Sequence, residues 1–458
     1  MFLIPVPGRT EGTKEIMPAS NSYGRLEVYP NFSPFTTYNC PEEYRLNIRI
    51  CNAGEKIYFG FGQTYDANQI AYSDVSFRVR APDGTIVMGP TSVPSSGTGF
   101  ISSYTRAVTG PSTIAAGGYT PFSYLPLTTG DYYIEFDFED FDLYRREFMF
   151  FDITVATAAG EAASGRLWSK AWQLTTSISA APDYYDNPFD GTMYVYADDG
   201  IVTSVDFNGM RPLVFTVCAN RSGCFNTGNQ YQDRKSVIGY YNYPQYKVFL
   251  NPPDEDCFPT GELGSITQPS WFSGCTPGDY CINITVNQAG TVEILLELNG
   301  ISGFQPNTAD RMIIADVEEG HNCIPFDGLN GLGNPVQENT QVVVSITYYN
   351  GITHLPLTDV EYNENGYIVR IIRPYTPNPV PALFWDDTNI PFGSTSPDGG
   401  CTNPTGCHNF YNFFGDSCTI NTWWYASENV HDTLDFVFHQ VLVDASLYTP
   451  YGADNDTA

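Results

Sequence analysis

Short runs in which apolar and polar residues alternate, separated by turn-forming residues, constrain the fold of this chain more than any other feature. Four such runs follow one another closely, at 281–286, 291–298, 311–317 and 341–349. Successive side chains of a β-strand point to opposite faces, so a period of two is typical of strands that bury one face. Intervening residues such as Gly328 and Asn330 tolerate the positive φ of tight turns. The segment is therefore predicted to form antiparallel strands of a β-sandwich.

The same alternation occurs in the first half of the chain, most clearly at 131–139. There Tyr132, Ile134, Phe136 and Phe138 are predicted to face a core, and the residues between them to face outward. Further strand-like runs lie at 46–50, 56–61, 75–80, 148–155, 192–197, 212–217, 245–250, 367–373 and 433–438. Since strands separated by turns recur without helical periodicity, we expect an all-β chain of three tandem Ig-like or jelly-roll β-sandwich domains.

The length of 458 residues suffices for about three domains. Small residues at 157–165 are typical of a linker. The predicted segments are an N-terminal arm or linker at 1–25, a β-sandwich at 26–157, a β-sandwich with a long disulfide-closed loop at 166–278, an Ig-like β-sandwich at 279–445 and an exposed tail at 446–458. The arm has two interpretations, a flexible terminus or a segment that adds a strand to a neighbouring subunit.

Two sets of motifs carry a resemblance to known families. The hairpin sequence within 323–336, with Phe326-Asp-Gly328, resembles the Ig-like repeat of flagellar hook-cap proteins and large bacterial surface proteins. The runs 384–389, 406–408 and 414–426 resemble a block in giant secreted adhesins of gliding and marine Bacteroidota, and the similarity covers about 281–445. The resemblance implies Ig-like sandwich repeats, type IX secretion and a role at the cell surface, and it supplies no catalytic residue.

The charge balance excludes two classes of partner. Asp and Glu number 51 against 21 Lys and Arg, which gives a net charge of −30. Such a surface repels nucleic-acid phosphates and anionic lipid, so we expect neither nucleic-acid nor membrane-surface binding. No apolar run approaches the roughly 18 residues of a membrane-spanning helix, so no membrane span is expected. The composition suits an extracellular protein that meets dissolved cations.

The 11 cysteines include several that are close in sequence, which favours disulfides in an oxidising compartment. The candidates for local disulfides are Cys40 and Cys51, Cys218 and Cys224, Cys257 and Cys275, and Cys401 and Cys407. Cys323 has no other cysteine close to it in the sequence. Because the number of cysteines is odd, one of them must remain a free thiol or form a disulfide with another chain. Spacing does not define the connectivity.

Five positions match short glycosylation patterns. Asn31, Asn220 and Asn283 precede x-Ser or x-Thr, the acceptor pattern for N-glycans. Thr433 and Thr457 follow Asp and resemble the O-glycan acceptor of Bacteroidota. These tripeptides arise often by chance, so they define candidates only.

Acidic residues gather at several predicted turns. The clusters are Asp198 with Asp199, Asp254 with Asp256, Asp386 with Asp387, and the oxygen-rich loops 299–310 and 327–334. Glycosidase chemistry needs two carboxyls opposed across a sugar, which adjacency in sequence does not provide. The clusters have two interpretations, solvated turns or calcium sites, because calcium takes several oxygen ligands from flexible loops. The sequence therefore predicts no cofactor other than a possible calcium ion.

The remaining motifs give no indication of an enzyme. Cys401, Cys407, His408 and Cys418 contain zinc-ligand types, but a disulfide beside a surface histidine fits their spacing better than zinc or a catalytic pair. The histidines are scattered, and no nucleophile, zinc-protease or phosphate-loop motif is present. The aromatic run 423–425 has three interpretations: core packing, an interface or a glycan-stacking platform.

These observations predict a non-enzymatic extracellular structural or adhesive protein of the cell surface. We expect it to associate with copies of itself, as a subunit of a surface fibre or as a segment of an adhesin. The cell surface or a glycan is a further possible partner. The alternative is a glycan- or calcium-binding module of a secreted enzyme.

Overall fold

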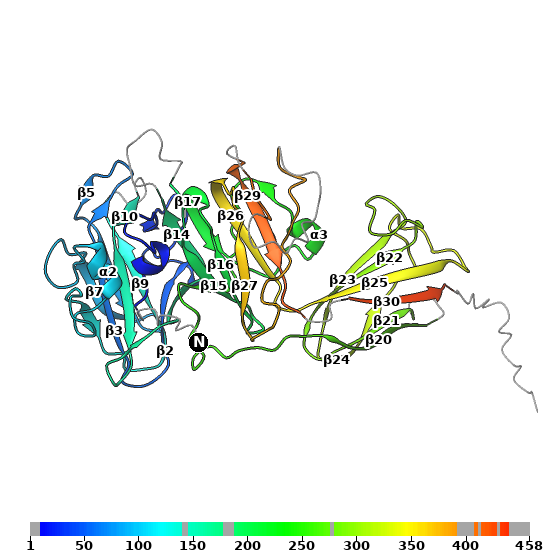
Figure 1. Cartoon of the computed structure of the whole chain (residues 1–458), viewed down its shortest axis with the longest axis horizontal. Coiled ribbons are helices and arrows are strands. Elements are labelled where there is room, and N and C mark those ends of the chain that lie inside the picture. The colour runs from blue at the N-terminus through cyan, green and yellow to red at the C-terminus, as the bar shows by residue number, and fades with distance from the viewer. Residues whose placement is uncertain are drawn as a thin grey trace, which may run out of the picture. The chain divides into compact units, whose positions relative to one another are not determined.

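The computed structural model describes residues 10–139, 145–176, 187–274, 279–391, 407–410, 414–427 and 431–438, and nearly all of its regular structure is antiparallel β-sheet (Figure 1). Helices in these ranges are short. They are α1 (Thr13–Ile16), α2 (Tyr104–Thr109), α3 (Gln230–Asp233) and the 3₁₀ turn η1 (Glu42–Tyr44). The predicted all-β class is confirmed.

The chain divides into two compact units. Unit 1 comprises Met1–Glu262 and Gly351–Ala426, and unit 2 comprises Leu263–Asn350 and Ser427–Ala458. The predicted domain at 279–445 therefore does not form one unit. Its later part returns to unit 1 because β26 (Thr353–Tyr362) pairs with β17 (Arg211–Cys218).

Two long sheets run through unit 1. The first follows the order β18-β29-β26-β17-β14-β1-β10-β4-β5, with β28 pairing β29. Its strands are β18 (Val237–Ile238), β29 (Gly415–Trp424), β26, β17, β14 (Ala171–Thr175), β1 (Arg25–Val28), β10 (Arg146–Phe148), β4 (Thr64–Tyr65), β5 (Ala71–Tyr72) and β28 (Phe384–Trp385).

The second long sheet follows the order β27-β16-β15-β19-β13-β2-β9-β6-β7. Its strands are β27 (Ile368–Arg373), β16 (Val202–Asp206), β15 (Thr192–Tyr196), β19 (Lys247–Phe249), β13 (Leu167–Ser169), β2 (Leu46–Ile50), β9 (Gly130–Asp137), β6 (Ser76–Arg80) and β7 (Ile86–Ser92). A four-stranded sheet completes unit 1, with β12 (Ala162–Ala163), β11 (Phe151–Ala156), β3 (Lys56–Phe61) and β8 (Phe122–Tyr124).

The boundary predicted at 157–165 lies inside unit 1. β13 pairs with β2, and β14 pairs with β1, so the segments on either side of that boundary share both long sheets. The two sheets also meet across the core. Trp172 of β14 donates its indole N–H to the backbone oxygen of Val248 in β19, at 2.8 Å, and both side chains are fully buried.

Aromatic residues fill much of this core. Phe136 and Phe148 pack at a centroid distance of 4.7 Å, and Phe136 also meets Phe61 edge-on. The predicted inward face of 131–139 is confirmed, since its four members are buried. Glu135 was expected to face outward but is 1% exposed, because it forms ion pairs with Arg78 and Arg80.

The expected N-terminal arm is part of the fold of unit 1 where the structure describes it, from residue 10. Glu11, Thr13 and Ile16 are buried. Gly12 bridges to Asp152 in β11, and Thr13 Oγ1 accepts a 2.8 Å hydrogen bond from the backbone of Phe151. These contacts hold the segment against β11, in place of a free linker.

Unit 2 is a separate β-sandwich. One sheet has the order β20-β21-β24, with β20 (Ile266–Ser273), β21 (Cys281–Val286) and β24 (Gly320–Pro325). The other has the order β23-β22-β25-β30, with β23 (Arg311–Val317), β22 (Gly290–Glu297), β25 (Gln341–Tyr349) and β30 (His431–Val437). Ile282 and Ile346 are examples of its buried core, and Phe272 stacks on Phe436 at 4.0 Å between the two sheets.

Candidate functional site

A row of buried polar side chains crosses the first long sheet of unit 1, on the face opposite the apolar core. We call it the polar row. Its members are Glu147 of β10, Glu27 of β1, Gln173 of β14, Thr216 of β17, Thr358 of β26 and Thr419 of β29. All six are completely buried. A row of this kind is unusual, because buried polar groups are costly unless they are hydrogen-bonded.

Several atoms of the polar row lack hydrogen-bond partners in the described part of the chain. They are Oε1 of Glu147 and the hydroxyls of Thr216 and Thr358, whereas the amide of Gln173 interacts with the carboxylate of Glu27 and helps to lower its pKa. Arg145 supplies a positive charge. Its Nε lies 3.2 Å from Oε1 of Glu27, and its Nη2 lies 3.4 Å from Oε1 of Glu147. Burial nevertheless raises the pKa of Glu27 to about 8, against the lowering effect of Arg145.

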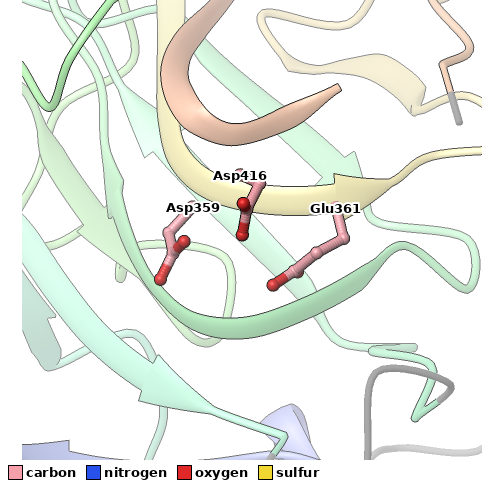
Figure 2. A group of neighbouring side chains, drawn as sticks. All are labelled: Asp359, Glu361 and Asp416. Carbon is pink, nitrogen blue, oxygen red and sulfur yellow. The ribbon is translucent and has the colours of Figure 1, made fainter. Parts of the chain in front are cut away.

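Three carboxylates gather next to the polar row, and we call them the acidic cluster: Asp359, Glu361 and Asp416 (Figure 2). Asp359 and Glu361 come from β26, and Asp416 comes from β29, its neighbour in the sheet. One oxygen of each carboxylate lies within 4.8 Å of the others. The strand register shifts between Thr358 and Val360, and Asp359 has a φ of 59°, so a bulge re-aims its side chain toward Asp416.

The electrostatics of the acidic cluster are those of like charges held close together. Burial and the charge of Asp416 raise the pKa of Asp359 to about 6, and burial and Asp359 raise that of Glu361 to about 8. Tyr240 donates its hydroxyl to this group, lying 3.3 Å from Oδ1 of Asp359 and 2.7 Å from the backbone oxygen of Asp416. The site thus holds oxygen ligands of the kind that hard cations prefer.

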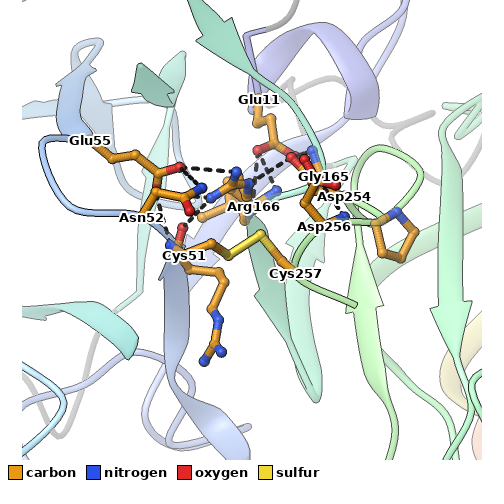
Figure 3. A network of polar contacts seen from close by, with 12 residues as sticks. Glu11, Cys51, Asn52, Glu55, Gly165, Arg166, Asp254, Asp256 and Cys257 are labelled. Carbon is orange, nitrogen blue, oxygen red and sulfur yellow. Dashed lines mark hydrogen bonds and ion pairs between the residues drawn. A yellow bond between two sulfur atoms is a disulfide. The ribbon is translucent and has the colours of Figure 1, made fainter. Parts of the chain in front are cut away.

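A second polar centre of unit 1 surrounds Arg166 (Figure 3). The guanidinium is 3% exposed and forms ion pairs with Glu55, at 3.0 Å, and Asp254, at 2.9 Å. Glu11 accepts hydrogen bonds from three consecutive backbone N–H groups, starting at Gly165. The geometry satisfies the donors of Arg166 with protein acceptors, so this centre is structural.

The disulfide Cys51–Cys257 borders the Arg166 centre. Cys51 also donates its backbone N–H to Glu55 at 2.8 Å. Burial opposes ionisation of Glu55, but the hydrogen bonds from Cys51 and Arg166 prevail and lower its pKa. The centre and the disulfide together join segments of unit 1 that are far apart in sequence.

The expected pairing of neighbouring cysteines is wrong where the structure describes both partners. Cys51 bonds to Cys257 instead of Cys40, because β13 lies between β2 and β19 and brings the 252–257 loop to the end of β2. Cys323 is not alone, since it bonds to Cys281 on the adjacent strand β21. Cys407 is disulfide-bonded, whereas Cys40, Cys218, Cys224 and Cys418 are free and buried. Cys275 and Cys401 lie outside the described residues.

The acidic turns identified from the sequence accept protein donors. Asp199 accepts a hydrogen bond from the backbone N–H of Gly351, and Asp254 accepts one from the guanidinium of Arg166. Asp310 accepts one from the backbone N–H of Leu298. In the loop 327–334, Asp327 accepts from the backbone of Leu329 and pairs with Arg311. Oδ2 of Asp386 lies 3.5 Å from Nζ of Lys235, and Oδ2 of Asp387 lies 3.0 Å from Nε2 of His408. The solvated-turn interpretation is wrong for Asp310, Asp386 and Asp387, which are 3%, 2% and 3% exposed because they bond to protein groups.

His408 is not the surface histidine that the spacing predicted. It is 2% exposed, with its ring between Oδ2 of Asp387, at 3.0 Å, and Oγ1 of Thr422, at 2.6 Å. Its ring also stacks on Trp385 at 4.7 Å. Because Cys407 is in a disulfide, it cannot offer zinc a thiolate beside this histidine.

The aromatic run 423–425 packs largely inside unit 1. Trp424 is fully buried and donates to Oγ1 of Thr203 at 3.2 Å. Trp423 is 8% exposed and stacks on His354 and Phe384. The core interpretation therefore holds for both tryptophans, and neither offers an open face to a sugar ring.

The glycosylation candidates differ in accessibility. Asn220 is fully buried, and its amide donates to the backbone oxygens of Gly223 and Tyr243. Asn283 is 5% exposed. Asn31 and Thr433 are exposed, and Thr457 lies outside the described residues. Of the four candidates that the structure describes, only Asn31 and Thr433 could carry a glycan without local opening of the fold.

Comparisons with known proteins do not place this chain in a family. No family model matches it, and no curated protein matches it. A solved structure of a DUF4785 family protein from Legionella pneumophila aligns with 11% identity over 74% of this chain and 85% of that one, with a TM-score of 0.15. No helix in the described ranges is long and apolar enough to cross a membrane.

Proposed function

We propose that this chain is a non-catalytic extracellular structural protein that acts through its surfaces, as a subunit of a self-assembling surface fibre or as a segment of an adhesin. The observation that carries the proposal is the covalent and ionic cross-linking of the sheets. Cys51–Cys257 lies beside the buried pairs of Arg166 in unit 1, and Cys281–Cys323 joins two strands of unit 2. Disulfides persist outside the cell and are rare in the cytosol.

The edges of the unit 2 sheet support self-association. β23 and β30 are the outer strands of the four-stranded sheet, and each has seven residues and no proline. Outer strands present unpaired backbone groups to which another chain can add a strand. Val437 on β30 is 42% exposed, so this edge has an apolar residue available for contact.

Electron microscopy of the purified full chain tests the assembly, and labelling of intact cells with an antibody tests the location. We expect strings, tubes or fibres, and surface labelling. The variant Val437→Lys should shorten or abolish the assemblies, because a charge at an outer strand opposes strand addition. Val343→Lys is the matched control, since Val343 is 37% exposed but lies on the inner strand β25. Only isolated particles of the unmodified chain, without surface labelling, would contradict the proposal.

A further inference from the structure

In the described part of the chain, the charge of Arg145 acts on Asp359 and lowers its pKa, but no direct ion pair balances the acidic cluster. Among the described residues, no Lys or Arg forms an ion pair with Asp359, Glu361 or Asp416. Arg145 is the nearby base, and its guanidinium is directed to Glu27 and Glu147 in the polar row. Three carboxylates held this close repel one another unless a counter-charge or protons are bound.

A second observation, independent of the clustering, points to a ligand. Glu361 is 1% exposed, and backbone N–H groups of Leu213 and of Glu361 itself bond its carboxylate, but its Oε2 has no hydrogen-bond partner in the described part of the chain. Figure 2 shows the carboxylate of Glu361 directed toward those of Asp359 and Asp416. A buried carboxylate oxygen without a donor is costly, and a bound cation would satisfy Oε2 of Glu361.

We propose that Asp359, Glu361 and Asp416 bind one calcium ion. The ligands are carboxylate oxygens, without His or Cys in the cluster, which favours a hard cation over zinc. Calcium takes oxygens at about 2.4 Å, so its opposite ligands can stand about 4.8 Å apart. The spread of the three oxygens, within 4.8 Å, fits around one such ion. Asp416 is exposed, so water can complete the coordination.

The site has a structural consequence for unit 1. Asp359 and Glu361 belong to β26, and Asp416 lies at the start of β29, so one ion would link two strands across their register shift. Calcium would then stabilise the folded state in proportion to its occupancy. This inference does not depend on whether the chain forms fibres.

Thermal unfolding and calorimetric titration of the full chain, freed of metal with a chelator, test the proposal. CaCl₂ should raise the melting temperature and bind at this site with a dissociation constant between about 10⁻⁶ and 10⁻³ M, and MgCl₂ should act more weakly. Asp416→Asn should weaken calcium binding at least about tenfold, since it removes one charged ligand. Glu361→Gln should abolish the calcium-induced shift while leaving the metal-free protein about as stable as wild type, because it removes a buried carboxyl group whose Oε2 has no donor.

The control is Glu364→Gln, which removes a carboxylate just beyond β26 whose side chain is 52% exposed. It should keep the full calcium response. The proposal is overturned if the wild-type chain shows no calcium-dependent shift, or if Asp416→Asn responds to calcium as wild type does. Asp416 is exposed, so this variant should fold even if Glu361→Gln does not.

Discussion

Cys51 and Cys257 are separated by 206 residues in the sequence, yet their Cα atoms lie 5.9 Å apart across a disulfide. Cys51 follows β2, and Cys257 lies in the loop after β19. β13 stands between these strands in the sheet and sets their separation. The bond therefore closes a loop that includes most of unit 1, and it lies beside Arg166.

Removing this disulfide should destabilise unit 1. In the chain-entropy account, a cross-link over so long a loop contributes about 5 kcal/mol by restricting the unfolded state. We expect Cys51→Ser with Cys257→Ser to lower the free energy of unfolding of unit 1, measured by denaturant titration under non-reducing conditions. The matched control is Cys281→Ser with Cys323→Ser, which should affect unit 2 instead. Equal stability of the first variant and wild type would show that the bond is dispensable.

Arg166 should contribute more to stability than its exposed counterparts. Arg166→Met leaves the buried carboxylate of Glu55 and the partly exposed one of Asp254 without their cation, and loss of one partner of a buried pair costs about 3–5 kcal/mol. Arg311→Met removes an ion pair with Asp327 that is more than a third exposed, and should cost less than about 1 kcal/mol. Chemical unfolding of both variants measures the difference, and similar losses would argue against a structural role for the Arg166 centre.

Local alternation predicted many strands well. The runs at 281–286 and 341–349 coincide with β21 and β25, because a strand's own residues carry the signal of which face is buried. The pairing of strands is not local. β26 pairs with β17, although the two strands are about 140 residues apart in the sequence; Thr216, for example, lies opposite Thr358. The alternation of apolar and polar residues does not specify which strand is the partner. The predicted domain boundaries therefore differ from the two observed units.

The acidic cluster shows the same limit at the level of side chains. The sequence drew attention to adjacent acidic pairs such as Asp198 and Asp199, which lie in the turn between β15 and β16 and accept hydrogen bonds from Gln245 and from the backbone of Gly351. Asp359 and Glu361 are two residues apart in an otherwise mainly apolar run, which was the available signal. Asp416 lies close to these two residues only because β29 pairs with β26 and the register shifts there. Neither the pairing nor the shift can be predicted from the sequence.

Asp152 should make the stability of unit 1 decline as the pH rises. It is 1% exposed, and its Oδ2 accepts a 2.6 Å hydrogen bond from Tyr119. Burial raises its pKa from 3.8 to about 8, so between these values the folded state holds a proton that the unfolded state has lost. Stability from this group is full below pH 3.8 and falls by up to about 1.4 kcal/mol per pH unit as the pH approaches 8.

The variant Asp152→Asn keeps an acceptor for Tyr119 and removes the titration. Its unfolding free energy should therefore depend less steeply on pH over that window, as measured by urea titration at a series of pH values. Burial also raises the pKa of Glu11 to about 8 and that of Glu15 to about 7, so part of the slope should remain. Asp83→Asn, at an exposed turn, is the control and should leave the slope intact. An unchanged slope in Asp152→Asn would contradict the assignment.

His354 should act in the opposite direction, on the acid side. It is 3% exposed in β26, where its Nδ1 lies 3.0 Å from the amide of Asn421 and its ring stacks on Trp423. Burial, helped by the charge of Arg234, lowers its pKa from 6.5 to about 3. Between these values the unfolded state binds a proton that the folded state does not, so stability falls as the pH drops, by up to about 1.4 kcal/mol per pH unit.

The test of His354 is the variant His354→Gln, which retains an acceptor for Asn421 but does not titrate. We expect it to lose less stability than wild type when the pH is lowered from about 7 to about 4, because the unfolded chain no longer gains that proton. His431→Gln changes an exposed histidine of unit 2 and is the matched control. If both variants lose stability in acid as wild type does, His354 is not the group that links protonation to the unfolding of unit 1.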